Sequence, residues 1–160
     1  MIKYSFEPIS NKEATILILG TMPGEQSILL NQYYGHSRNN FWKFVYTIFE
    51  TPFSDDYENK KALLLENNIA LWDVLQVCER KGSLDSAIKN EVANDFEHFL
   101  KNHPKINHIF FNGQKAASFF KKYVSLEKEY PTTILPSTSP ANAGKTFEEK
   151  LLDWKKILLK

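Results

Sequence analysis

Residues 15–24 read Thr-Ile-Leu-Ile-Leu-Gly-Thr-Met-Pro-Gly, a short apolar run followed by a loop with glycine at each end. An apolar run of this length, bounded by turn residues, predicts a buried strand. Gly20 and Gly24 allow the loop to turn tightly and a ligand to approach its backbone, while Pro23 fixes one φ angle and stiffens the loop. The spacing of the glycines matches neither a P-loop nor a dinucleotide fingerprint. The loop is therefore either a plain turn or the edge of a site that does not hold a nucleotide cofactor.

Three further apolar runs repeat the strand pattern, and helical patterns lie between them. The predicted strands cover residues 15–19, 69–72, 106–111 and 132–135. The predicted helices cover residues 41–49, 55–66, 96–100 (with Asn94 as its cap) and 114–123, and a last helix opens with the capping-box pair Thr146 and Glu149 and runs to Leu158. Strands that alternate with helices imply parallel pairing and right-handed crossovers. The predicted fold is α/β, a three-layer αβα sandwich with a central four-stranded parallel sheet.

The composition bounds the class of protein. The 160 residues are expected to form one domain, because no repeat or linker divides them. With 20 basic and 19 acidic residues the net charge is +1, which makes no general electrostatic case for nucleic-acid binding. The single cysteine, Cys78, excludes an internal disulfide, a thiolate metal cage and an iron–sulfur cluster. No signal peptide or membrane span is recognisable, so we expect a cytoplasmic monomer without a cofactor or metal.

Polar residues gather where the predicted strands end. In an open parallel sheet the site forms outside the carboxyl ends of the strands. The segments that follow the four strands are 20–24, 73–75, 112–114 and 136–142. They contain Asp73, Asn112 and a loop rich in proline and serine. The sequence therefore predicts a catalytic cleft at this edge of the sheet.

Residues 33–42 read Tyr-Tyr-Gly-His-Ser-Arg-Asn-Asn-Phe-Trp and crowd aromatic, cationic and amide side chains together just before a helix. Asparagine is a preferred helix cap, so one of Asn39 and Asn40 is explained by capping alone. Capping does not explain both asparagines, nor the aromatic pair that precedes them. The segment is therefore a second candidate part of the cleft.

These motifs resemble the uracil-DNA glycosylase superfamily. GTMPG followed by YYGHSRNNFWK is similar to the first signature region of its mismatch-specific branch, and LWDVL, FFNGQKA and LPSTSPANA are similar to the later segments. The resemblance covers residues 15–143, about four-fifths of the chain. YYGHSRNNFW, ALWDVL, CERKGSLDS and LPSTSPANA resemble the hypoxanthine-DNA glycosylase branch in particular.

Two departures from the family pattern narrow the expected chemistry. Met22 stands where the mismatch-specific enzymes carry a catalytic asparagine, and a thioether neither positions nor activates water. The resemblance to the hypoxanthine branch implies that the catalytic amide is instead Asn39. Leu135 stands where several branches place a histidine, so help from that histidine with a leaving-group anion is not expected.

The resemblance also assigns residues to the flipped base. Tyr34 matches the aromatic residue that stacks on the base, with Phe41 and Trp72 as alternates that also fit an apolar core. Met22 is a further candidate for contact with the base. Asp73 matches the position that reads the base edge, and Asn112 is the candidate amide beside it. Capping of a turn by Asp73, and a left-handed turn at Asn112, are the alternative interpretations.

The loop at residues 136–142 fits a clamp on the DNA backbone, because short hydroxyls and amides bind phosphate while prolines hold the loop rigid. Gly24, Ser137, Ser139 and Asn142 are the candidate contacts, and residues 79–83 and Lys145 are further candidates. The alternative is a plain surface loop. No large side chain follows in residues 141–143 to fill the space that a flipped base leaves, so the wedge is missing or comes from elsewhere.

The resemblance implies a monofunctional DNA glycosylase that hydrolyses the N-glycosidic bond of a deaminated base, first of all hypoxanthine, in base excision repair. Its partner is then DNA with a deaminated or mismatched base. Excision of uracil or thymine from mismatches is the first alternative, and Met22 argues against it. The second is a member that binds DNA without catalysis, because two expected catalytic positions are apolar. The absence of a Gly-x-Ser-x-Gly elbow argues against a hydrolase of the α/β type.

Overall fold

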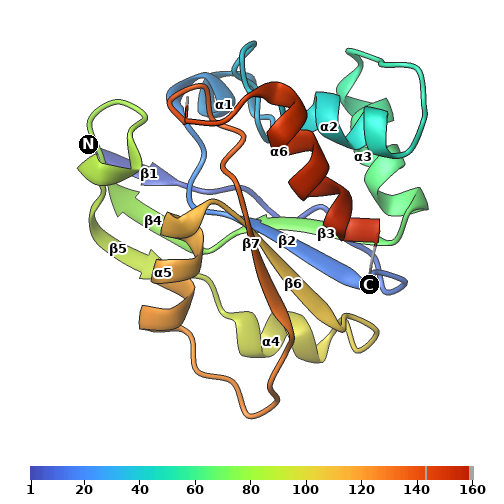
Figure 1. Cartoon of the computed structure of the whole chain (residues 1–160). Coiled ribbons are helices and arrows are strands. Elements are labelled where there is room, and N and C mark those ends of the chain that lie inside the picture. The colour runs from blue at the N-terminus through green and yellow to red at the C-terminus, as the bar shows by residue number, and fades with distance from the viewer. Residues whose placement is uncertain (143, 159–160) are drawn as a thin grey trace.

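The computed structural model describes residues 1–142 and 144–158, and a four-stranded parallel sheet lies at its centre (Figure 1). The strand order is β3-β2-β6-β7, and all pairs are parallel. The strands are β2 (Ile16–Gly20), β3 (Ile69–Asp73), β6 (His108–Asn112) and β7 (Thr132–Leu135). All four predicted strands are present, and β6 begins two residues later than predicted. The predicted fold class is confirmed.

Each face of the sheet carries its own core. Ile16 and Ile18 lie on one face of β2, and Leu17 and Leu19 lie on the other, because successive side chains of a strand point to opposite faces. All four side chains are at most 1% exposed. A strand that is apolar on both faces is stable only between two layers of helices.

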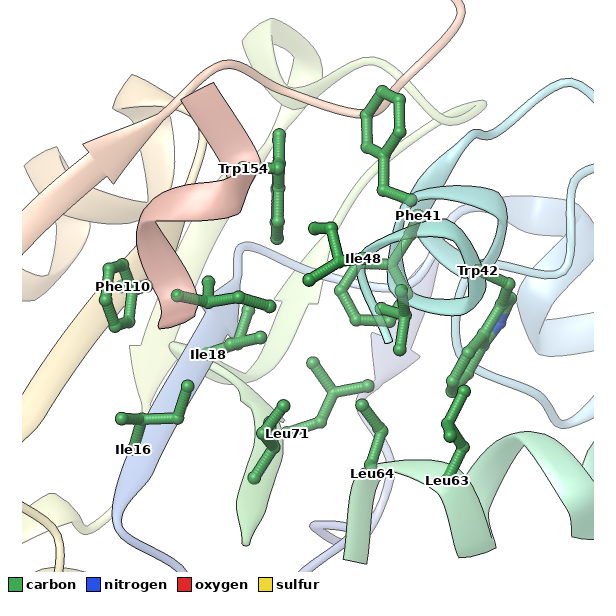
Figure 2. Packing of buried hydrophobic residues seen from close by; sticks show 14 of the residues in the cluster. Ile16, Ile18, Phe41, Trp42, Ile48, Leu63, Leu64, Leu71, Phe110 and Trp154 are labelled. Carbon is green, nitrogen blue, oxygen red and sulfur yellow. The ribbon is translucent and has the colours of Figure 1, made fainter. Parts of the chain in front are cut away.

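The helices cover both faces (Figure 1). On the face of Ile18 lie α2 (Phe41–Ile48), α3 (Tyr57–Glu66) and α6 (Phe147–Trp154), and Figure 2 shows Phe41, Ile48 and Trp154 from these helices packed above that face of the sheet. On the other face lie α4 (Phe96–Lys101) and α5 (Gln114–Tyr123). A short α1 (Glu25–Leu30), which the sequence did not predict, follows residues 20–24, called here the first loop.

The helix caps agree with the sequence in one case and differ in another. Thr146 and Glu149 form the predicted capping box, after which α6 ends at Trp154 and a 3₁₀ turn, η2 (Lys155–Leu158), continues the chain. The prediction that Asn94 caps α4 is wrong. Asp95 caps it by accepting a hydrogen bond from the His98 backbone N–H at 3.1 Å.

Three strands that the sequence did not reveal form a second, antiparallel sheet. Its order is β1-β4-β5, with β1 (Ile2–Tyr4), β4 (Leu75–Glu79) and β5 (Lys89–Ala93). Only Val74 separates β3 from β4, so the chain passes directly from one sheet into the other. Asn94 braces this junction, because its side chain donates hydrogen bonds to the backbone oxygens of Asp73 and Leu75. Among the described residues, no helix has the length and apolar character of a membrane span.

Candidate active site

A cleft of about 780 Å³ opens at the carboxyl ends of the parallel strands, where the sequence predicts the site. Its volume is in the range of pockets that hold small-molecule ligands. Nine of the ten residues that the sequence predicts for the site line it, namely Met22, Gly24, Tyr34, Asn39, Asp73, Asn112, Ser137, Ser139 and Asn142. Phe41 is the exception. Ser83, from the further candidates at residues 79–83, also lines the cleft, and so do residues 84–86, which the sequence analysis did not place in the site.

Asp73 and Tyr34 meet at the floor of the cleft beside Gly20. A Cβ atom on Gly20 would lie 2.6 Å from both Asp73 Oδ1 and the Tyr34 hydroxyl, so only glycine fits here. Asp73 Oδ2 and the Tyr34 hydroxyl are buried, and neither has a hydrogen-bond partner among the described residues. Two unpaired polar atoms in a buried place are costly, and a ligand that pairs with them recovers that cost. The floor is therefore built to receive polar atoms.

The charge state of Asp73 is set by its burial. The side chain is 3% exposed, and loss of solvation together with the negative charge of Asp85 raises the pKa of Asp73 to about 7, against the pull of the Arg80 guanidinium. Burial and the charge of Asp73 also raise the pKa of the Tyr34 hydroxyl, which therefore stays protonated. Asp73 thus exchanges its proton near neutral pH, whereas Tyr34 is a fixed donor.

Tyr34 combines an unusual backbone conformation with aromatic packing. Its φ angle is 54°, in the left-handed region that bulky residues rarely adopt. Its ring stacks on Phe41 at 4.3 Å between centroids. Phe41 is 0% exposed and lies behind Tyr34 in the core, so the proposed direct contact between Phe41 and a base is not available. Trp72 is also turned to the core, where it packs on Phe99 at 4.8 Å.

Asn112 joins strand β6 to the loop at residues 136–142, called here the second loop. Its amide donates to Thr138 Oγ1 at 2.9 Å, and its carbonyl oxygen accepts from the Thr138 backbone N–H at 3.0 Å. The left-handed turn residue is Gly113, with φ of 94°, rather than Asn112. Asn112 is therefore first a clamp on the second loop, and only its remaining donor and lone pair are free for a ligand.

Asn39, rather than Asn40, provides the side-chain hydrogen bond at the start of α2. Asn39 Oδ1 accepts a hydrogen bond from the Phe41 backbone N–H at 2.9 Å, while the side chain of Asn40, next to α2, makes no cap hydrogen bond. The Asn40 backbone N–H donates to Thr138 O at 3.3 Å and so ties the start of α2 to the second loop. A carbonyl oxygen has two lone pairs. The hydrogen bond from Phe41 therefore orients the side-chain amide of Asn39 and leaves one acceptor position on its oxygen free.

The second loop is rigid through its own hydrogen bonds. Ser137 Oγ and Ser139 Oγ accept from the backbone N–H groups of Ser139 and Ala141, both at 3.2 Å. The Asn142 amide donates to Ser137 O at 3.2 Å. Each serine hydroxyl accepts one bond inside the loop and keeps its hydrogen for an outside acceptor such as a phosphate oxygen. Leu135, just before the loop, is 1% exposed and belongs to the core.

Among the further candidates at residues 79–83, Arg80 is not available to contact phosphate, because it is buried. Its side chain is fully buried and donates to the backbone oxygens of Pro23 and Gly82, and it lies 3.9 Å from Asp85. Arg80 therefore holds the first loop, residues 20–24, against the connection between β4 and β5. Lys145 forms an ion pair with Asp153 at 2.9 Å. Among the described residues, no three His, Cys, Asp or Glu side chains gather as metal ligands do.

The close approach at Gly20 makes a direct prediction. Gly20→Ala places a methyl group against Asp73 and Tyr34, and a displacement of about 1 Å at a reacting centre costs roughly a hundredfold in rate. We expect the single-turnover catalytic rate of Gly20→Ala to fall by at least about that factor. Gly144→Ala is the control, because a Cβ there meets nothing within 4 Å. Equal rates for the two variants would contradict the crowding at Gly20.

The raised pKa of Asp73 predicts how stability depends on pH. Folding favours the protonated carboxyl of Asp73. The contribution of this carboxyl to the stability of the folded protein is therefore complete below its ordinary pKa of 3.8 and is lost as the pH rises through about 7. Asp73→Asn removes this loss. We expect the melting temperature of Asp73→Asn, relative to the unsubstituted protein, to increase between about pH 5 and about pH 8. A difference that does not change with pH would contradict the raised pKa.

Comparisons with known proteins agree with this geometry. The family model of the uracil DNA glycosylase superfamily matches residues 7–159. Proteins named hypoxanthine DNA glycosylase from Methanosarcina acetivorans and Methanosarcina barkeri are 41% and 38% identical over 143 residues, 89% of this chain and 89% of each relative. The solution NMR structure of an M. acetivorans protein, described as a candidate uracil DNA glycosylase, is 36% identical with a TM-score of 0.83 and covers 98% of this chain and 96% of its own. The chain belongs to the uracil DNA glycosylase superfamily.

Proposed function

We propose that this protein is a monofunctional DNA glycosylase that hydrolyses the N-glycosidic bond of hypoxanthine in DNA, the first step of base excision repair. The observation that carries the proposal is the floor of the cleft, where Asp73 Oδ2 and the Tyr34 hydroxyl are buried without partners. A purine with an N–H donor and carbonyl acceptor at its edge complements these two atoms. The printed names of the two Methanosarcina relatives support the same substrate.

Asn39 positions the water in this proposal. The target nucleotide must leave the stack and enter the cleft, which costs a few kcal/mol, least for a mispaired base. Hydrolysis then passes through an oxocarbenium-like sugar and needs water on one face. The amide does not titrate, so it orients the water rather than acting as a strong base, and fixed dipoles supply the remaining stabilisation. Its hydrogen bond to the Phe41 backbone N–H holds the amide in one orientation.

Asp73 and Tyr34 read the base. Ionised Asp73 accepts a hydrogen bond from N1–H of hypoxanthine, and the Tyr34 hydroxyl, which stays protonated, is a donor for the O6 or N7 acceptor. Adenine has a bare acceptor at N1 and faces the carboxylate with lone pair against lone pair. Because Asn112 is occupied by Thr138, it supports the floor instead of carrying selectivity alone.

Uracil is the second candidate base, because its N3–H also offers a donor to Asp73. A structural relative is described as a candidate uracil DNA glycosylase. A panel of hypoxanthine, uracil and mismatched thymine in one duplex context ranks the substrates.

Contacts from Ser137 and Ser139 to phosphate are proposed to hold the DNA without reading its sequence. We also propose that the enzyme acts as a cytoplasmic monomer beside the chromosome.

Asn39 combines a cap with the proposed catalytic role, and two substitutions separate them. Asn39→Ala loses both, whereas Asn39→Ser keeps a capping oxygen, worth about 1 kcal/mol. We expect both variants to lose at least about a hundredfold in single-turnover excision of hypoxanthine, with DNA affinity unchanged, and only Asn39→Ala to lose stability. Asn40→Ala is the control and should retain activity. Recovery of the rate in Asn39→Ser would show that Asn39 is only a cap.

Asp73 sets base choice in this proposal. Asp73→Asn presents a donor or an acceptor to N1, so the penalty against adenine disappears. A buried polar mismatch is worth ~1–3 kcal/mol, or roughly ten- to two-hundredfold in rate. We expect the ratio of hypoxanthine to adenine excision in single-stranded DNA to fall by a factor in about that range. An unchanged ratio would assign selectivity to Tyr34 or to the backbone.

A further inference from the structure

We propose that Leu84 is the wedge that enters the base stack when the target nucleotide leaves it. The proposal rests on the proposed function, since only an enzyme that flips a base needs such a residue. Proteins that open a duplex insert large apolar side chains between base steps. The second loop offers none among its described residues, because Pro140 and Ala141 are the apolar side chains there that line the cleft.

Leu84 combines two properties at the cleft. It lines the cleft together with Ser83, Asp85 and Ser86, and it is 61% exposed. Within the described residues, no other large apolar side chain that lines the cleft is exposed. Met22, for comparison, is 8% exposed and belongs to the core beneath the first loop.

The segment that carries Leu84 is anchored on both sides. Before it, Ser83 Oγ accepts the Glu25 backbone N–H at 2.8 Å, and the buried Arg80 side chain donates to Gly82 O. After it, the Ala87 backbone N–H donates to Leu84 O at 3.0 Å and opens the 3₁₀ turn η1 (Asp85–Ala87). An exposed leucine on an anchored segment is suited to insertion, because little conformational entropy is lost when it binds.

The same anchors fix Leu84 relative to the floor. The Arg80 side chain also donates to Pro23 O, so the first loop, which begins at Gly20, and the segment around Leu84 are joined. The side chain at the rim is thereby connected to the floor, because Gly20 lies against Asp73 and Tyr34. The wedge therefore acts on the duplex at the mouth of the pocket that receives the base.

A wedge has a different effect on duplex and single-stranded substrates. It stabilises the opened duplex by filling the vacated space with an apolar side chain that is removed from water. A single strand has no such space. Loss of Leu84 should therefore slow excision from duplex and leave excision from a single strand unchanged, which distinguishes a wedge from a residue that supports the fold or the chemistry.

The test compares Leu84→Ala with Leu152→Ala, a control on α6 that is 69% exposed and does not line the cleft. Single-turnover excision of hypoxanthine is measured from a duplex and from a single strand of the same sequence. We expect Leu84→Ala to lose about tenfold or more on the duplex and to stay near the unsubstituted rate on the single strand, while Leu84→Met retains the duplex rate. Equal losses on both substrates, or no loss on the duplex, would overturn the proposal.

A second readout is independent of excision. Fluorescence of 2-aminopurine placed as the target in a duplex increases when the base leaves the stack. It should increase with the unsubstituted protein and with Leu152→Ala, and it should not increase with Leu84→Ala at saturating protein. An equal increase with Leu84→Ala would contradict the wedge, whether or not the protein excises a base. Failure of the unsubstituted protein to excise any of the bases would contradict only the proposed hydrolysis.

Discussion

The paired hydrogen bonds between Asn112 and Thr138 join the parallel sheet to the second loop, and the shape of the cleft depends on them. Asn112 is the last residue of β6, so it is fixed by the core on both faces of the sheet. Thr138 is 1% exposed, and its backbone oxygen accepts a hydrogen bond from the Asn40 backbone N–H, so Thr138 also fixes the start of α2. The side-chain amide of Asn112 thus positions the second loop, the start of α2 and, next to it, Asn39. Trp154 adds a second support by donating to Pro136 O at 2.8 Å.

The buried charges around the cleft show what the site costs the fold. Asp73 is buried without a partner for one oxygen, and Arg80 is buried with one nitrogen unpaired. Groups of this kind destabilise a folded protein unless a function retains them. Arg80 holds two backbone oxygens and lies near Asp85, so its burial has a structural purpose. The unpaired oxygen of Asp73 has none within the described residues, which is why it points to a ligand.

The central sheet could be predicted because its strands are apolar on both faces, as at Ile16–Gly20. The second sheet could not, because β5 reads Lys-Asn-Glu-Val-Ala and carries no apolar alternation that marks a strand. The cleft residues were predictable from strand ends and family resemblance, whereas the burial of Arg80 was not. Its partner Pro23 lies 57 positions away, and only the folded chain brings a buried acceptor to that guanidinium. The local spacing also did not distinguish which asparagine caps α2.

The direct passage from β3 into β4 separates the central parallel sheet, which ends at Asp73, from a peripheral antiparallel sheet. Asp73 ends the parallel sheet, and one residue later the antiparallel sheet begins, whose β4–β5 connection forms part of the cleft rim. Insertions or deletions in that connection leave the four central strands and their two cores in place. Changes in the length and side chains of this one hairpin can therefore alter the proposed contacts with a double helix, while Asp73 and the central strands keep their positions.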